Sequence, residues 1–318
     1  MKIAFLDTLT IGDNISLNSI AKEGELETYK ITSPAETAAR IKDADIVITN
    51  KVEINIGDKE LAQADKLKLI CVAATGYNNV DLAAAKKKGV VVANVSGYST
   101  DAVAQMIFAY ILSFYNVISE YDQSVKQGEW SKSHIFTLLK YPIAGLRDKT
   151  LGIIGYGAIG QQVAKIARAF DMKVIAASRT GAKHSEDFRV ELPELLAQSD
   201  IITIHTPLTK KTENLIGAKE LAAMKPEAIL INAARGGIVN EDALYQALKD
   251  KKIRAAALDV LVEESPKSGS KLFELDNIII TPHVAWATRE SRQRLVEGVA
   301  ENIRKFKAGK GAEIDLCT

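Results

Sequence analysis

The stretch Gly155-Tyr156-Gly157-Ala158-Ile159-Gly160 decides the fold class. It follows the apolar run Thr150–Ile154 and opens an apolar-periodic stretch, residues 161–170, so the pattern predicts a strand, a tight turn and a helix. In this order the first glycine permits the turn, the second lets the backbone approach a pyrophosphate, and the third lets the helix pack on the strand. The helix N-terminus adds free N–H groups and the positive end of a dipole. We therefore expect a dinucleotide-binding unit rather than an ordinary glycine turn.

Strand-like and helical segments alternate along the whole chain, which is typical of an α/β protein with parallel sheets. Six apolar runs predict a complete doubly wound nucleotide domain: residues 150–154, 173–177, 201–205, 228–232, 254–259 and 277–281. Five earlier runs predict a second sheet: residues 2–6, 27–31, 45–49, 67–73 and 90–94. Candidate helices lie between these runs, for example residues 34–41 and 82–88.

The C-terminal stretch determines how we expect the domains to be connected. It predicts a helix with one apolar face, formed by Leu295, Val296, Val299, Ile303 and Phe306. Because this helix follows the last strand of the nucleotide domain, we expect it to pack on the N-terminal sheet. The fold would then have two Rossmann-like doubly wound domains: a substrate domain of residues 1–98 and 286–318, and an inserted dinucleotide-binding domain of residues 99–285. The two crossings would form a hinge around a cleft.

The composition is that of an ordinary globular protein: 47% of 318 residues are apolar, 25% are charged and the net charge is +1. Since acidic and basic residues are interspersed, we expect no nucleic-acid or membrane partner. Cys71 and Cys317 are too few for a disulfide framework or a metal cluster. The start of the chain reads as a strand without a signal-peptide layout, so we expect a cytoplasmic location. The apolar residues 102–118 include polar side chains and are expected to form a buried helix.

The segment from Glu120 to Arg147 lacks a clean period and is unusually long for an excursion within a compact domain. Its apolar residues have the pattern of exposed side chains: Trp130, Ile135, Phe136, Leu138 and Leu139. We expect it to be an arm that forms a homodimer. The alternative is a lid or a loop that packs locally.

Polar side chains follow three successive strands of the predicted nucleotide domain. Arg235 follows the fourth strand, Asp259 and Glu264 follow the fifth, and His283 follows the sixth. Because ligands bind beyond the carboxyl ends of the strands in doubly wound sheets, these side chains are candidates for one site.

Together, these side chain types favour reduction of a 2-oxo acid. A guanidinium such as that of Arg235 grips a carboxylate with two hydrogen bonds. An imidazole such as that of His283 exchanges a proton near neutral pH, and a neighbouring carboxylate such as that of Glu264 fixes the ring's tautomer. Each residue also has a simpler interpretation: Arg235 could bind a surface carboxylate, His283 could be structural, Glu264 could be solvated, and Asp259 could bind the cofactor or cap a turn.

Taken together, these segments resemble the D-isomer-specific 2-hydroxyacid dehydrogenases over essentially the whole chain. The resemblance rests on residues 74–81, 155–160, 205–208, 232–237, 258–264 and 281–283. It implies that Arg235 binds the substrate carboxylate, that His283 is the acid/base and that Glu264 is its partner. It further implies cofactor contacts by Thr206, Ala233, Ala234, Arg235, Asp259 and His283, in addition to the glycine stretch. Backbone N–H groups of Ala74, Thr75 and Gly76 would help to hold the substrate carboxylate.

Within that family, residues 49–52, 128–131 and 281–287 are similar to glycerate dehydrogenases, which are hydroxypyruvate and glyoxylate reductases. In these stretches Lys51 is either a substrate contact or a solvated lysine, and Trp286 is either a cofactor contact or a core aromatic residue. A short phosphoglycerate dehydrogenase is the second candidate. A dinucleotide-sensing corepressor is a third, from a different class of function.

The sequence departs from the family pattern in three places. The second nucleotide-domain strand, which usually ends in an acidic residue, is followed here by Ser178-Arg179-Thr180. No carboxylate would repel a 2′-phosphate there and Arg179 could pair with one, so we expect a preference for NADP(H), with NAD(H) as the alternative. Ala158 stands where many relatives carry an arginine. Ser265 separates Glu264 from the following proline, which leaves Glu263 as an alternative partner of His283.

Overall fold

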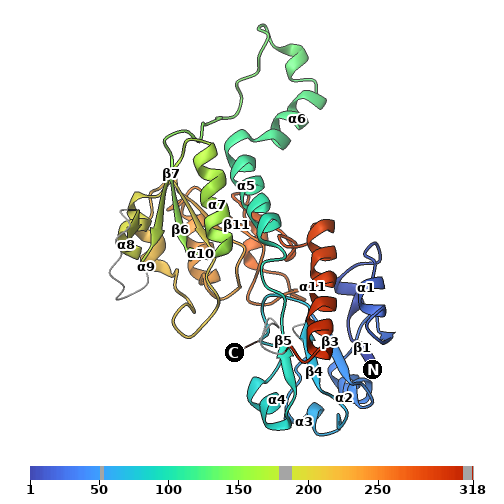
Figure 1. The fold of residues 1–318 in the computed structure, drawn as a ribbon. Coiled ribbons are helices and arrows are strands. Elements are labelled where there is room, and N and C mark those ends of the chain that lie inside the picture. The colour runs from blue at the N-terminus through green and yellow to red at the C-terminus, as the bar shows by residue number, and fades with distance from the viewer. Residues whose placement is uncertain (51–53, 179–187, 311–316, 318) are drawn as a thin grey trace. The chain divides into compact units, whose positions relative to one another are not determined.

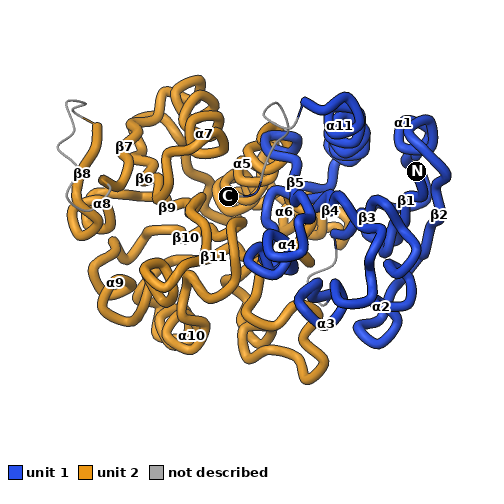
Figure 2. Tube along the Cα trace, turned by 60° about the horizontal axis from the view of Figure 1, so that its bottom comes forward, with its two compact units in different colours: residues 1–99, 286–318 blue, residues 100–285 orange. Residues whose placement is uncertain are grey.

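The computed structural model describes residues 1–50, 54–178, 188–310 and 317 (Figure 1). The chain divides into two compact units, one of Met1–Ser99 with Trp286–Thr318 and one of Thr100–Ala285 (Figure 2). The polypeptide thus leaves the first unit once and returns to it once. The predicted insertion of one α/β domain into another is confirmed.

The first unit is built on a five-stranded parallel sheet with the order β2-β1-β3-β4-β5. Its strands are β1 (Lys2–Phe5), β2 (Glu25–Thr28), β3 (Ile46–Thr49), β4 (Leu69–Val72) and β5 (Val91–Ala93). Its shorter helical segments are η1 (Thr8–Thr10), α1 (Asn18–Ala21), α2 (Pro34–Ile41), α3 (Asp58–Leu61) and α4 (Leu82–Lys88). Every residue of β3 and β4 is buried, because apolar clusters cover both faces of the sheet.

The C-terminal helix α11 (Arg289–Lys307) belongs to the first unit. The Thr288 side chain caps it by accepting a hydrogen bond from the Ser291 N–H group. The face that the sequence predicted to be apolar packs in one cluster with sheet residues such as Phe5, Ile48 and Leu69. This packing explains why the chain returns to the first unit.

The second unit contains a seven-stranded parallel sheet with the order β12-β11-β10-β9-β6-β7-β8. Its strands are β6 (Thr150–Ile154), β7 (Lys173–Ala177), β8 (Arg189–Val190), β9 (Ile201–Ile204), β10 (Ile229–Asn232), β11 (Ala255–Leu258) and β12 (Ile278–Ile280). The six predicted strands are all present, but the prediction missed β8. This strand has only two residues, too few to produce a sequence period.

Helices complete the second unit: α5 (Thr100–Asn116), α6 (Ile118–Lys126), α7 (Ala158–Ala169), α8 (Leu192–Gln198), α9 (Ala218–Ala222) and α10 (Glu241–Lys249), with the short helical turns η2 (Trp130–Lys132) and η3 (Lys271–Glu274). Helix α5 lies beside α7 (Figure 1), where Phe108 stacks on Phe170 with ring centroids 5.5 Å apart. In the described part of the chain no single helix is long and apolar enough to cross a membrane. Only α5 and α6 together, bent by 51° at their junction, have the required length and composition.

Two stretches differ from the sequence expectation in detail. Strand β2 begins at Glu25 rather than residue 27, because its register pairs Glu25 with Lys2, and Ile31 lies exposed beyond its end. The segment from Glu120 to Arg147 begins within α6, a helix that the sequence analysis did not predict, and has one further helical turn, η2. Phe136 and Leu139 of this segment are 90% and 79% exposed, whereas Leu138 is half-buried.

Candidate active site

The backbone of the turn between β6 and α7 requires glycine at two of its three glycine positions, and the third leaves space. Gly155 has φ +98°, and a Cβ atom there would collide with the carbonyl group of His205. A Cβ atom on Gly160 would collide with the Gly155 carbonyl oxygen, so only glycine lets the helix pack this closely. A Cβ atom on Gly157 would meet nothing within 4 Å, which leaves open space at the start of α7. This turn fits a dinucleotide pyrophosphate.

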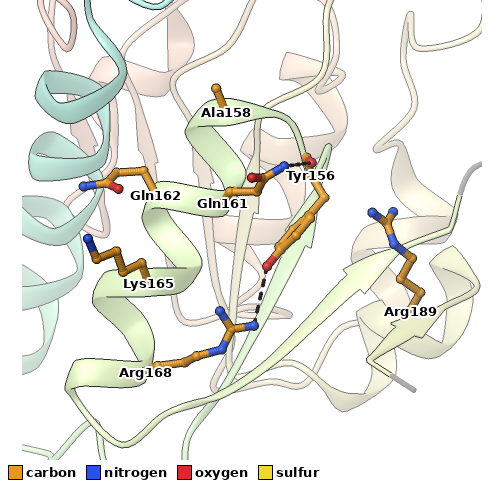
Figure 3. A pocket seen from close by; sticks show the side chains of 7 residues that line it. All are labelled: Tyr156, Ala158, Gln161, Gln162, Lys165, Arg168 and Arg189. Atoms are coloured by element: carbon orange, nitrogen blue, oxygen red, sulfur yellow. Dashed lines mark hydrogen bonds between the residues drawn. The ribbon is translucent and has the colours of Figure 1, made fainter. Parts of the chain in front are cut away.

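A positively charged hollow of about 650 Å³ adjoins this turn (Figure 3). Among the described residues, its lining includes three basic side chains and no carboxylate: Tyr156, Ala158, Gln161, Gln162, Lys165, Arg168 and Arg189. The Arg189 guanidinium lies 5.3 Å from the centroid of the Tyr156 ring, and Arg168 donates a hydrogen bond of 3.5 Å to the Tyr156 hydroxyl. Sequence reasoning missed Arg189, because it lies on the unpredicted strand β8.

The other predicted cofactor residues of the second unit lie at the carboxyl ends of neighbouring strands. Ser178 follows β7, and its N–H group donates to the Val190 carbonyl. Thr206 follows β9, while Ala233 and Ala234 follow β10, and all are half-buried. Arg179 and Thr180 lie outside the described residues.

Arg235 is positioned by a tight turn after β10. The Asn232 side chain donates to the Arg235 carbonyl (2.9 Å) and accepts from the Ala234 N–H group (3.0 Å). Gly236 lies so close to the Leu261 carbonyl that any side chain there would collide with it. The loop carrying Arg235 therefore packs directly against the loop after β11, which continues to Glu264.

Glu264 and His283 form a hydrogen-bonded pair. Oε2 of Glu264 lies 2.7 Å from Nδ1 of His283, and the two side chains are 38% and 35% exposed. The structure therefore pairs His283 with Glu264 and not with Glu263. His283 has φ +54°, in the left-handed region that a residue other than glycine seldom adopts. The strand order places the segments bearing Arg235, Glu264 and His283 after three adjacent strands.

The Asp259 carboxylate is buried and is engaged by the turn that carries His283. Oδ1 accepts from the Val284 N–H group (2.9 Å) and from the Thr281 hydroxyl (2.5 Å), and Oδ2 accepts from the Ala285 N–H group (2.8 Å). The sequence left two interpretations of Asp259, a cofactor contact or a residue that caps a turn. The hydrogen bonds agree with the second. Contact with the cofactor stays a prediction.

His205, directly after β9, is a further titratable group that the sequence analysis included only in the stretch 205–208. Burial lowers its pKa to about 3, so the ring is neutral, and its Nε2 lies 2.9 Å from the Thr203 hydroxyl oxygen. No cluster of three His, Cys, Asp or Glu side chains suited to a metal ion is present among the described residues.

The predicted site residues of the first unit follow β4. The Ala74 carbonyl accepts from the Val95 N–H group, and the Thr75 carbonyl accepts from the Asn94 side chain (2.7 Å), which fixes the backbone just before Gly76. Trp286 packs on the core of the first unit with its ring edge-on to Tyr98 at 6.1 Å. Lys51 lies outside the described residues.

Comparisons with known proteins agree with this architecture. Residues 108–285 match the family described as "D-isomer specific 2-hydroxyacid dehydrogenase, NAD binding domain". The chain is 43% identical to the glycerate dehydrogenase of Methylorubrum extorquens over 97% of both chains. It is 41% identical to the glyoxylate reductase of Thermococcus litoralis over 98% of this chain and 95% of that one.

Among solved structures, an acyclic imino acid reductase in complex with NADPH and D-Arg superposes with a TM-score of 0.86. It is 32% identical in sequence, and the match covers 99% of each chain. The domain match and the full-length likeness to a glycerate dehydrogenase point to the same family. The protein belongs to the D-isomer-specific 2-hydroxyacid dehydrogenase family.

Proposed function

We propose that the protein reduces a small 2-oxo acid of the hydroxypyruvate and glyoxylate class to the D-2-hydroxy acid, using a nicotinamide cofactor, and that it catalyses the reverse reaction. The observation that carries this proposal is the hydrogen-bonded pair of Glu264 and His283 beside the Arg235 loop. The substrate class is supported by the likeness to a glycerate dehydrogenase, since oxidation of the 2-hydroxyl group of glycerate gives hydroxypyruvate.

Arg235 binds the substrate carboxylate in this proposal. Its guanidinium keeps its charge at any physiological pH and can form two parallel hydrogen bonds to a carboxylate. In the first unit, the backbone N–H groups of Ala74, Thr75 and Gly76 after β4 stay our candidates for carboxylate donors. Holding this end of the substrate fixes the orientation of its carbonyl group.

His283 exchanges the proton. Glu264 at Nδ1 keeps a proton on that nitrogen, so the other ring nitrogen, Nε2, exchanges a proton with the substrate oxygen. When bound, the nicotinamide supplies the hydride that adds to the carbonyl carbon. His283 donates a proton to the carbonyl oxygen as the C=O π bond breaks, which gives the alcohol and leaves the imidazole neutral. In the reverse direction the neutral ring accepts the hydroxyl proton.

The glycine turn and the first turn of α7 hold the cofactor pyrophosphate, and Ser178, Thr206, Ala233 and Ala234 line the same edge of the sheet. We infer a preference for NADP(H) over NAD(H). Strand β7 is followed by Ser178 rather than by a carboxylate, and Arg179 comes next in the sequence. Lys165, Arg168 and Arg189 make the adjoining hollow positively charged, which favours an additional phosphate on the cofactor.

The exposed segment from Glu120 to Arg147 supports a homodimer as part of this proposal. It presents several large apolar side chains: Trp130, Ile135, Phe136, Leu139 and Ile143. Exposed apolar side chains gathered in one segment are typical of protein interfaces. We also infer a cytoplasmic location, with support from the cysteines Cys71 and Cys317, which are not joined in a disulfide.

The function is tested by following NADPH and NADH oxidation with a panel of 2-oxo acids. The panel is hydroxypyruvate, glyoxylate, pyruvate and 3-phosphohydroxypyruvate. We expect hydroxypyruvate or glyoxylate to give the highest kcat/KM, and chiral chromatography to identify D-glycerate as the product from hydroxypyruvate. Preference for 3-phosphohydroxypyruvate would favour a phosphoglycerate dehydrogenase. Cofactor binding without oxidation by any of the four acids would indicate a dinucleotide-sensing protein instead.

A further inference from the structure

We propose that Tyr110, on α5, is a positioning residue for His283, because its hydroxyl holds the turn that presents the imidazole through Thr281 and Asp259. The inference rests on the proposed function, since it concerns how His283 is held for proton transfer. Tyr110 lies far from His283 in the sequence, and no motif singles it out.

Tyr110, Thr281 and Asp259 form a chain of two hydrogen bonds in which each donor can be identified. The Tyr110 hydroxyl contacts the Thr281 hydroxyl, and Thr281 Oγ1 lies 2.5 Å from Asp259 Oδ1. Thr281 donates in its hydrogen bond to Asp259, and a threonine hydroxyl has a single proton, so that proton is directed to Asp259. The Tyr110 hydroxyl must therefore be the donor to Thr281. Loss of the Tyr110 hydroxyl would leave a lone pair of Thr281 without this donor.

Asp259 forms hydrogen bonds with residues that precede and follow His283 in the sequence. The His283 N–H group donates to the Asp259 carbonyl (2.8 Å), and the next two N–H groups, those of Val284 and Ala285, donate to its carboxylate. His283 itself has φ +54°. A backbone conformation of this kind persists only where surrounding contacts hold it. Tyr110 and Thr281 therefore help to hold the conformation that directs His283 toward Glu264.

The environment of Tyr110 keeps its hydroxyl in this role. Tyr110 is only 3% exposed and Asp259 only 1%, so water does not replace either partner readily. Burial raises the pKa of Tyr110 to about 12, which keeps the phenol protonated and able to donate throughout the range in which a histidine titrates.

Helix α5 gives Tyr110 a rigid base. The helix has 17 residues and packs beside α7, the helix that begins at the glycine turn (Figure 1). Phe108, two residues before Tyr110, stacks on Phe170 at the end of α7 and holds the two helices together. Tyr110 thus connects the turn bearing His283 to the scaffold that we expect to hold the cofactor.

The test is the Tyr110→Phe variant, which keeps the ring and removes only the hydroxyl. We expect kcat for hydroxypyruvate reduction to fall roughly tenfold, because a displaced acid transfers its proton less efficiently. The dissociation constant of NADPH, from fluorescence titration, should stay within about twofold of the wild-type value, since no cofactor contact is removed. We also expect the pH profile of kcat/KM to shift, because the pairing of His283 with Glu264 is disturbed.

Two further sets of variants distinguish positioning from a general loss of stability. Tyr115→Phe removes the hydroxyl of another buried tyrosine on the same helix, whose ring centroid lies 5.4 Å from the Arg254 guanidinium, and should leave kcat and the pH profile unchanged. Thr281→Val should reproduce the Tyr110→Phe phenotype, whereas Thr281→Ser should retain most of the activity. The kcat of the double variant Tyr110→Phe/Thr281→Val should be no lower than that of either single variant, because both changes break the same hydrogen bond. Melting temperatures are measured for each variant.

A Tyr110→Phe enzyme with the kcat and pH profile of the wild type would overturn the proposal, as would equal losses in Tyr110→Phe and Tyr115→Phe. Both results leave the proposed function standing. A wild-type enzyme without reductase activity would instead overturn the proposed function, and this inference with it.

Discussion

Gly236 lies directly against the carbonyl group of Leu261. This contact joins the loop that carries Arg235 to the loop that carries Glu264, although the two loops follow different strands. The Glu264 carboxylate then accepts from His283, which follows the third strand of the group. A group suited to carboxylate binding and a pair suited to proton exchange are thus built from adjacent strand ends.

Arg235→Lys tests the proposed grip on the substrate carboxylate. Lysine keeps the charge but loses the planar pair of donors, so we expect KM for hydroxypyruvate to rise roughly tenfold and kcat to fall by a smaller factor. Steady-state kinetics measure both, with NADPH affinity as the control. Unchanged KM and kcat would show that Arg235 does not bind the substrate.

Arg179→Asp tests the cofactor preference. A carboxylate at this position would repel a 2′-phosphate, so we expect the ratio of kcat/KM for NADPH to that for NADH to fall roughly tenfold or more. Lys219→Asp on α9 is the matched control, because it makes the same change of charge elsewhere in the second unit. A ratio that stays the same in Arg179→Asp would sink the proposed NADP(H) preference.

The stability of the protein should depend on His205 in acid. Its folded pKa is about 3, below the ordinary value of 6.5, so the unfolded chain binds a proton first as the pH falls. The free energy of unfolding therefore decreases from pH 6.5 down to about 3, by at most about 1.4 kcal/mol per pH unit from this one group. Urea unfolding at several pH values measures the slope. His205→Asn should flatten it, whereas the exposed His134→Asn should not; identical slopes in all three proteins would contradict this account.

Association of two chains should depend on the exposed apolar side chains between Glu120 and Arg147. Phe136→Asp puts a charge where the proposed interface has an aromatic residue that is 90% exposed in the single chain. We expect the dimer dissociation constant to rise roughly tenfold or more in sedimentation measurements. Phe273→Asp, at a 53% exposed aromatic residue outside this segment, should not weaken the dimer. A monomeric wild-type protein would contradict the proposed role of this segment in a homodimer.

The sequence was sufficient for the fold because its signals are local. The glycine stretch lies between a strand and a helix, and strands such as β3 and β4 are buried apolar runs that a short window reveals. Strand β8 was missed because two residues show no period. Arg189 was missed with it, since only its place on β8 brings it to the Tyr156 ring.

The candidate site was predictable as a set of residues but not as a geometry. Strand-end positions and the family resemblance pointed to Arg235, Glu264 and His283. The choice between Glu264 and Glu263 depends on the path of the loop after β11, which spacing does not determine. The role of Tyr110 could not be predicted, because its hydroxyl contacts Thr281 through the tertiary fold and the two residues lie 171 positions apart in the sequence.

The central claim is that His283, held by Glu264, transfers the proton during reduction. The most direct measurement is hydroxypyruvate turnover by His283→Ala, compared with the wild type under saturating cofactor. We expect kcat to fall about a thousandfold while NADPH binds with near-normal affinity. A variant that retains wild-type kcat would contradict the account.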